Sequence, residues 1–63
     1  MTKADLILVH NIKQSIQDLE LEQDTIYANL LEDVGVVKGT RADDILFDYI
    51  YNDSYHLLGE LCP

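Results

Sequence analysis

Apolar residues recur at helical spacing through the first half of the chain. From Val9 onward they follow one another at alternating intervals of three and four positions, which is the seam of a heptad pattern. No Gly or Pro interrupts residues 2–34, and Gly35 can adopt the left-handed conformation that ends many helices. The pattern predicts one long helix over about residues 3–33. The seam comprises Val9, Ile12, Ile16, Leu19, Gln23, Ile26 and Leu30.

A second amphipathic stretch predicts a helix over about residues 41–58, with Gly59 as its stop. Its apolar residues form two stripes, so a single neighbouring helix cannot cover them all. Residues 52–54 are weak helix formers, and a restart at Ser54 is the alternative to a continuous helix. The first stripe comprises Ala42, Leu46, Tyr49, Ile50 and Leu57, and the second comprises Phe47, Tyr51, Tyr55 and Leu58.

Each predicted helix begins at a Thr-x-x-Asp sequence. Thr2 precedes Asp5 in the first, and Thr40 precedes Asp43 in the second. In this arrangement the threonine oxygen accepts an early backbone N–H, while the carboxylate is stabilised by the positive end of the helix dipole. Both sequences occur where apolar periodicity starts, so we expect both threonines to cap helices.

The two predicted helices differ in length, which argues for a second chain. At ~1.5 Å per residue the first is ~46 Å long and the second ~27 Å, so a hairpin leaves ~19 Å of the first uncovered. Each large apolar side chain in that overhang contributes about 1.5 to 3 kcal/mol when fully buried. A second copy that covers the overhang predicts an all-α, dimeric four-helix bundle. The overhang contains Leu6, Ile7, Leu8, Val9 and Ile12.

A break in the first helix is the alternative arrangement. Asp24 and Thr25 are residue types that cap helix N-termini, and either could begin a separate short helix that runs through Glu32. A break near residue 24 predicts a three-helix monomer that folds back on itself. Because Glu and Gln support helices and no breaker is present, we favour the continuous helix and the homodimer.

A chain this short is expected to be only marginally stable on its own. Its 63 residues predict a single helical domain, residues 1–63, and a domain this small buries only about 60% of its unfolded surface. Cys62 is the only cysteine, so no internal disulfide can form, and oligomerisation is the expected aid. We assign self-association to residues of the overhang, to Ile16 of the seam and to the aromatic residues of the second stripe. They are Leu6, Leu8, Val9, Ile12, Ile16, Phe47, Tyr51 and Tyr55.

Acidic residues outnumber basic residues twelve to four, which gives a net charge of −8. This charge opposes direct binding of nucleic acid or anionic membranes and favours a protein partner with a basic surface. Most of the acids fall into two blocks that contain no Lys or Arg. We assign partner binding to acids in these blocks, namely Glu20, Asp24, Asp43, Asp44 and Asp48.

No group of residues predicts catalysis or a metal site. The best local ligand set is His56, Glu60 and Cys62, whose spacing is not typical of zinc sites. Asp44 and Asp48 lie one helical turn apart, but like charges so placed are usually a solvated edge. We therefore expect a protein that is not an enzyme and that binds no cofactor.

These observations predict a small acidic interaction protein that binds and modulates a cellular protein. Its size and lack of catalytic chemistry suit a phage-borne or accessory regulator or inhibitor. One alternative is a structural or scaffold subunit of a larger complex, and another is an acidic nucleic-acid mimic that occupies a basic groove. The longest early apolar run, residues 6–9, is too short for a signal peptide or a membrane span, so we expect a cytoplasmic protein.

Overall fold

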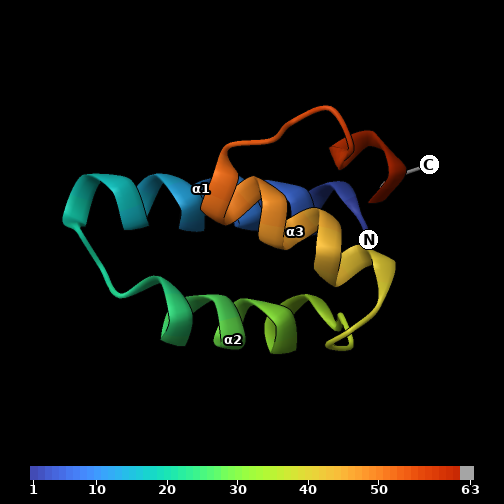
Figure 1. Cartoon of the computed structure of the whole chain (residues 1–63), viewed down its shortest axis with the longest axis horizontal. Coiled ribbons are helices and arrows are strands. Elements are labelled where there is room, and N and C mark those ends of the chain that lie inside the picture. Colours follow the sequence, from blue (N-terminus) through green and yellow to red (C-terminus); the bar gives the residue numbers. More distant parts are fainter. Residues whose placement is uncertain (62–63) are drawn as a thin grey trace.

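The computed structural model describes residues 1–61, and every regular element in that range is helical (Figure 1). The order is α1 (Lys3–Leu19), α2 (Gln23–Val34), α3 (Arg41–Asn52) and a short 3₁₀ helix, η1 (Leu58–Leu61). The prediction of an all-α fold is confirmed. The chain has the three-helix arrangement given as the alternative, whereas the long helix over residues 3–33 is wrong.

The first helix ends at Leu19 because Glu20 adopts a left-handed conformation, with φ 52° and ψ 42°. The backbone N–H groups of Glu20 and Leu21 both donate to the carbonyl of Ile16, which closes the helix. Holding a residue other than glycine in this conformation costs about 1 to 3 kcal/mol. The turn lets α2 fold back beside α1, and the packing it permits offsets that cost.

Three side chains of α2 are buried as a result of the fold-back: Tyr27, Leu30 and Leu31. Full burial of a large apolar side chain contributes about 1.5 to 3 kcal/mol, so these three together outweigh one strained residue. Local helix propensity through Glu22 and Gln23 favoured continuation, and tertiary packing overrides it. The break falls at residues 20–22, slightly before the predicted position.

The third helix also ends earlier than predicted. It stops at Asn52, and Asp53 adopts a left-handed conformation with φ 57°. Residues 54–57 then turn back along α3, and η1 follows from Leu58. The expectation of a helix over residues 41–58 is therefore wrong, and the weak helix formers at 52–54 mark the position where the helix ends.

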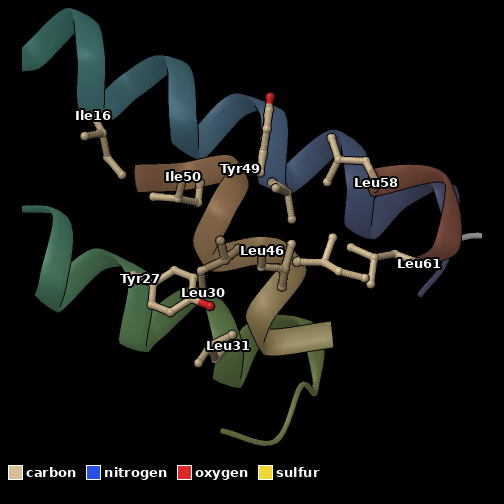
Figure 2. Packing of buried hydrophobic residues seen from close by; sticks show 11 residues of the cluster. Ile16, Tyr27, Leu30, Leu31, Leu46, Tyr49, Ile50, Leu58 and Leu61 are labelled. Carbon is tan, nitrogen blue, oxygen red and sulfur yellow. The ribbon is translucent and has the colours of Figure 1, made fainter. Parts of the chain in front are cut away.

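The chain covers the N-terminal half of α1 with its own C-terminal segment. Leu58 and Leu61 lie beside this half of α1 in Figure 2 and belong to the same buried cluster as Val9, which is 0% exposed. The N-terminal ammonium group of Met1 donates to the carbonyl of Leu61 across 2.9 Å. Within the described residues the chain itself thus covers the predicted overhang except for Ile7, which is 60% exposed, and this removes the length mismatch as a reason for a second copy.

The core lies where α3 packs against the other helices (Figure 2). It contains four residues of α3, with Leu46 fully buried at its centre. Leu30 of α2 and Val9 of α1 are also fully buried. No helix in residues 1–61 is both long and apolar enough to cross a bilayer. The buried apolar cluster is Val9, Ile16, Tyr27, Leu30, Leu31, Ile45, Leu46, Tyr49, Ile50, Leu58 and Leu61.

Candidate functional site

Three aromatic rings meet where α2 packs against α3. Phe47 and Tyr51 lie one turn apart on α3 and stack with their ring centroids 4.2 Å apart. Tyr27 of α2 stands nearly perpendicular to both rings, at centroid distances of 5.9 Å to Phe47 and 5.7 Å to Tyr51. Offset stacking and edge-to-face contact are the favoured arrangements of aromatic pairs. The contacts hold the three rings as one rigid cluster.

Two carboxylates are held beside these rings by tyrosine hydroxyls. The hydroxyl of Tyr27 donates to the main-chain carbonyl of Asp43, at 2.8 Å, and to its carboxylate. The hydroxyl of Tyr51 donates to the carboxylate of Asp24, at the start of α2. The carboxylate of Asp43 also accepts the backbone N–H of Gly39 at 2.8 Å. Each bond links α3 to α2 or to the loop between them, so the acids have defined positions.

The protonation states suit these hydrogen bonds at neutral pH. The N–H of Gly39 and the hydroxyl of Tyr27 stabilise the charged carboxylate and lower the pKa of Asp43. Burial, with the hydrogen bond to Asp43, raises the pKa of Tyr27 well above its usual range. Burial and the bond to Asp24 raise the pKa of Tyr51 to about 12. The tyrosines therefore act as donors and Asp43 acts as an acceptor.

These groups surround an open pocket of about 290 Å³ between α2 and α3, here named the α2–α3 pocket. Aromatic and aliphatic side chains form most of its lining, with two carboxylates and one ammonium group among them. Small-molecule sites usually measure about 300 to 1,000 Å³, so this pocket is suited to a single side chain rather than a large ligand. Its lining residues are Asp24, Tyr27, Ala28, Leu31, Lys38, Asp43, Phe47 and Tyr51.

The structure brings together two of the five acids assigned to partner binding. Asp24 and Asp43 line the α2–α3 pocket, from different helices. Asp44 is exposed and Asp48 half-buried on α3, outside the lining, and the carboxylate of Asp48 accepts the amide of the neighbouring Asn52. Glu20 lies exposed at the turn between α1 and α2.

The residues of α1 assigned to self-association face the core of their own chain. Val9 and Ile16 are buried within the chain, so neither side chain is exposed to a second copy in this fold. Leu6, Leu8 and Ile12 are partly buried against the same cluster. The buried members of the heptad seam therefore make contacts within the chain.

The aromatic residues assigned to self-association are more accessible. Phe47 is 45% exposed at the pocket, with Tyr51 half-buried beside it. Tyr55 is 61% exposed beyond α3, and its ring packs on that of Tyr49. Phe47 and Tyr55 thus remain available to another molecule.

A buried lysine is the feature that the sequence interpretation missed. Lys13 is only 5% exposed, and its ammonium group donates to the carbonyls of Tyr49 and Ile50 at 2.7 and 3.4 Å. It also forms a salt bridge with Asp53. The available signal was its position four residues after Val9, on the apolar face of α1. Lys13 neutralises the end of α3 and is a structural residue.

Side chains that bind metals are not gathered in the described part of the chain. In residues 1–61 no group of three or more His, Cys, Asp or Glu side chains is arranged to hold a metal ion. Cys62, the third member of the candidate set with His56 and Glu60, lies outside the described residues. Glu60 instead forms a salt bridge with Arg41, whose Nη2 donates to both carboxylate oxygens at 2.8 and 3.0 Å.

Comparisons with protein-family models, with curated proteins and with solved structures give no match for this chain. Its function is therefore inferred from the residues and their geometry.

Proposed function

We propose that this chain is a small, non-enzymatic interaction protein that binds and modulates a cellular protein through a basic surface of that partner. The observation that carries the proposal is the pairing of unneutralised acids with an accessible aromatic pocket. Aromatic residues are enriched at protein interfaces, where their rings supply large contact areas. Clustered charge speeds association with an oppositely charged partner and selects against others.

The charge of the surface is largely unpaired within the chain. Residues 1–61 include all twelve acidic residues, and two of them form salt bridges: Asp53 with Lys13, and Glu60 with Arg41. The other ten carboxylates in this range have no salt-bridge partner. A basic partner surface gains attraction from them without first breaking an ion pair inside this protein.

The proposal is tested with a partner that is first captured by the immobilised chain and identified, and then purified and titrated. We expect binding to weaken as salt rises, because exposed charges more than ~10 Å apart are screened at 0.1 M salt. Neutralising Asp43, Asp44 and Asp48 together to Asn should weaken binding about tenfold, at up to ~1 kcal/mol per exposed pair.

The matched control neutralises three exposed acids outside α3, Asp18, Glu32 and Asp33, and so changes the net charge equally. This control variant should weaken binding less than the variant in which Asp43, Asp44 and Asp48 are neutralised. Circular dichroism checks that both variants are helical. A purified partner that binds both variants as tightly as the natural chain, at low and high salt, would refute the proposal.

A second candidate function is a structural subunit that joins a larger complex or its own copies. The observation in its favour is a set of large apolar side chains that are exposed in the single chain. Phe47 and Tyr55 are the aromatic members of this set, so a homodimer is proposed to use them rather than the buried seam of α1. Sedimentation against concentration tests it, with Tyr55→Ala as the variant that should dissociate a dimer. The set is Ile7, Leu19, Leu21, Val37, Phe47 and Tyr55.

The acidic nucleic-acid mimic is a narrower form of the main proposal. It requires the partner to use the same basic groove for nucleic acid and for this chain. A short DNA duplex that displaces this chain from the purified partner supports it, and simultaneous binding of both refutes it.

A further inference from the structure

We propose that the α2–α3 pocket binds an arginine side chain of the partner, whose guanidinium group packs on the ring of Phe47 and bonds to the carboxylates of Asp24 and Asp43. The inference rests on the proposed function, since it names the group of the basic partner that the pocket recognises. It commits to an arginine within a protein segment.

The pocket supplies both of the contacts that a guanidinium group uses. Its planar face stacks on aromatic rings, and its five N–H donors bond to carboxylates. Phe47 offers an accessible ring, 45% exposed, that is held in place by stacking on Tyr51. Asp24 and Asp43 line the same pocket from opposite helices. A carboxylate has about four acceptor positions, so the tyrosine bonds leave capacity for a ligand.

The rigidity of the pocket favours binding of a defined group. Tyr27 fixes Asp43, and Tyr51 fixes Asp24, through hydrogen bonds between side chains. Gly39 fixes the second oxygen of Asp43. Groups already held in position lose less conformational entropy when a ligand binds. Lysine lacks the planar donor array that matches such fixed carboxylates, so the arrangement favours arginine over lysine.

The charge in the pocket favours a cation, although Lys38 also belongs to the lining. The lining contains two acidic residues, Asp24 and Asp43, and one basic residue, Lys38. Within residues 1–61 Lys38 forms no salt bridge, so its side chain is free to turn toward solvent when a guanidinium group enters. Replacing Lys38 with glutamine should therefore strengthen arginine binding, whereas it would weaken the binding of an acidic ligand.

The test titrates the isotopically labelled chain with blocked pentapeptides that carry one arginine, lysine or citrulline between glycines. Citrulline keeps the planar shape of arginine but has no charge. We expect the arginine peptide to shift the amide signals of the pocket residues. The citrulline peptide should bind about tenfold more weakly than the arginine peptide, and the lysine peptide about threefold more weakly. Lys38→Gln should raise the affinity for the arginine peptide about twofold.

Two variants remove the proposed contacts, and one serves as the control. Phe47→Ala should lower the affinity for the arginine peptide about fivefold. Asp24→Asn, which keeps an acceptor for Tyr51, should also lower this affinity about fivefold. Asp33→Asn removes an exposed carboxylate outside the pocket and should leave the affinity unchanged. The amide spectrum of each free variant shows whether it is folded.

The outcomes separate the inference from the proposed function. The pocket assignment is wrong if the arginine peptide binds away from the pocket, or if it binds Phe47→Ala and Asp24→Asn as tightly as the natural chain. The proposal of a partner with a basic surface is unaffected by that result. Equal binding of the lysine and arginine peptides overturns the preference for a guanidinium group. If the arginine peptide does not bind in low salt, the inference is refuted, whereas the proposed function is decided separately by the binding of the purified partner to the Asn variants.

Discussion

The ammonium group of Lys13 donates to the main-chain carbonyl of Tyr49 across 2.7 Å, although 36 positions separate them in the chain. The same nitrogen lies 4.8 Å from the centre of the Tyr49 ring. Carbonyl groups at a helix C-terminus lack partners within the helix and carry partial negative charge. A cation from α1 therefore satisfies the end of α3, and this contact joins the first and third helices.

Removing that cation should destabilise the fold. We expect Lys13→Met, which keeps an apolar stem of similar length, to lower the free energy of unfolding by about 2 kcal/mol, because hydrogen bonds to charged groups contribute about 1.5 to 3 kcal/mol. Chemical denaturation measures the change. Lys3→Met is the control, since Lys3 is exposed and surface changes usually stay within about 0.5 kcal/mol. Equal stability of the two variants would contradict the role of Lys13.

The turn at Glu20 gives a prediction whose sign depends on the fold. Because Glu20 has a positive φ of 52°, Glu20→Gly should raise the free energy of unfolding by about 1 kcal/mol. In an uninterrupted helix the same change would lower it by about 1 kcal/mol, the cost of glycine in a helix interior. Denaturant titration distinguishes the two signs, and Gln17→Gly, inside α1, is a control that should be destabilising.

Asp43 should make the stability of the fold depend on pH in the acidic range. Its pKa is lower in the folded chain than its ordinary value of 3.8, so its contribution is complete above that value and is lost as the pH falls through the folded pKa. We expect the free energy of unfolding to fall below about pH 4 and Asp43→Asn to flatten this fall. Unfolding curves between pH 7 and pH 2 test the prediction. An unchanged slope in Asp43→Asn, with Asp33→Asn as the comparison, would contradict it.

The hydroxyl of Tyr27 should be stabilising at neutral pH. Tyr27→Phe keeps the ring contacts but removes the bonds to Asp43, so we expect a loss of about 1.5 to 3 kcal/mol. The folded pKa of Tyr27 is raised, which means that its contribution is complete below pH 10 and is lost as the pH rises through the folded value. Tyr27→Phe should accordingly be less sensitive than the natural chain to alkaline unfolding above pH 10. A variant as stable as the natural chain at pH 7 would refute this role.

The local signals in the sequence predicted the ends of elements well where they depend on a single side chain. Thr2 and Thr40 cap α1 and α3 through bonds from Asp5 and Asp43, and Gly35 ends α2 with φ 72°. The apolar seam correctly included the buried Val9, Ile16 and Leu30, whereas its member Leu19 is 67% exposed at the end of α1. These features depend on neighbours three or four residues away, which the sequence shows directly.

The break at residues 20–22 was not predictable from such neighbours. Glu20 has no special preference for a left-handed conformation, and the turn is stabilised by burial of Tyr27 and Leu30, which contact other elements. Lys13 was missed for a similar reason, because its partners at the end of α3 lie 36 to 40 residues away. Tertiary contacts decided both features.

The residues of the candidate site were predicted to be functional, but they were assigned to two different surfaces. Asp24 and Asp43 were assigned to a partner surface, whereas Phe47 and Tyr51 were assigned to self-association. Tyr27 supplies the missing link, since it contacts both rings and bonds to Asp43. This combination depends on the register between α2 and α3, and helical periodicity alone does not specify it.

The surfaces proposed here require a single chain that folds back at residues 20–22 and brings α1 against α3. Nuclear Overhauser contacts between Lys13 and Tyr49, measured in a mixture of isotope-labelled and unlabelled chains, test this claim most directly. We expect the contacts within one labelled chain, together with a loss of regular helical contacts across residues 20–22. Helical contacts that continue through these residues, with Lys13 and Tyr49 meeting only between different chains or not at all, would contradict the account.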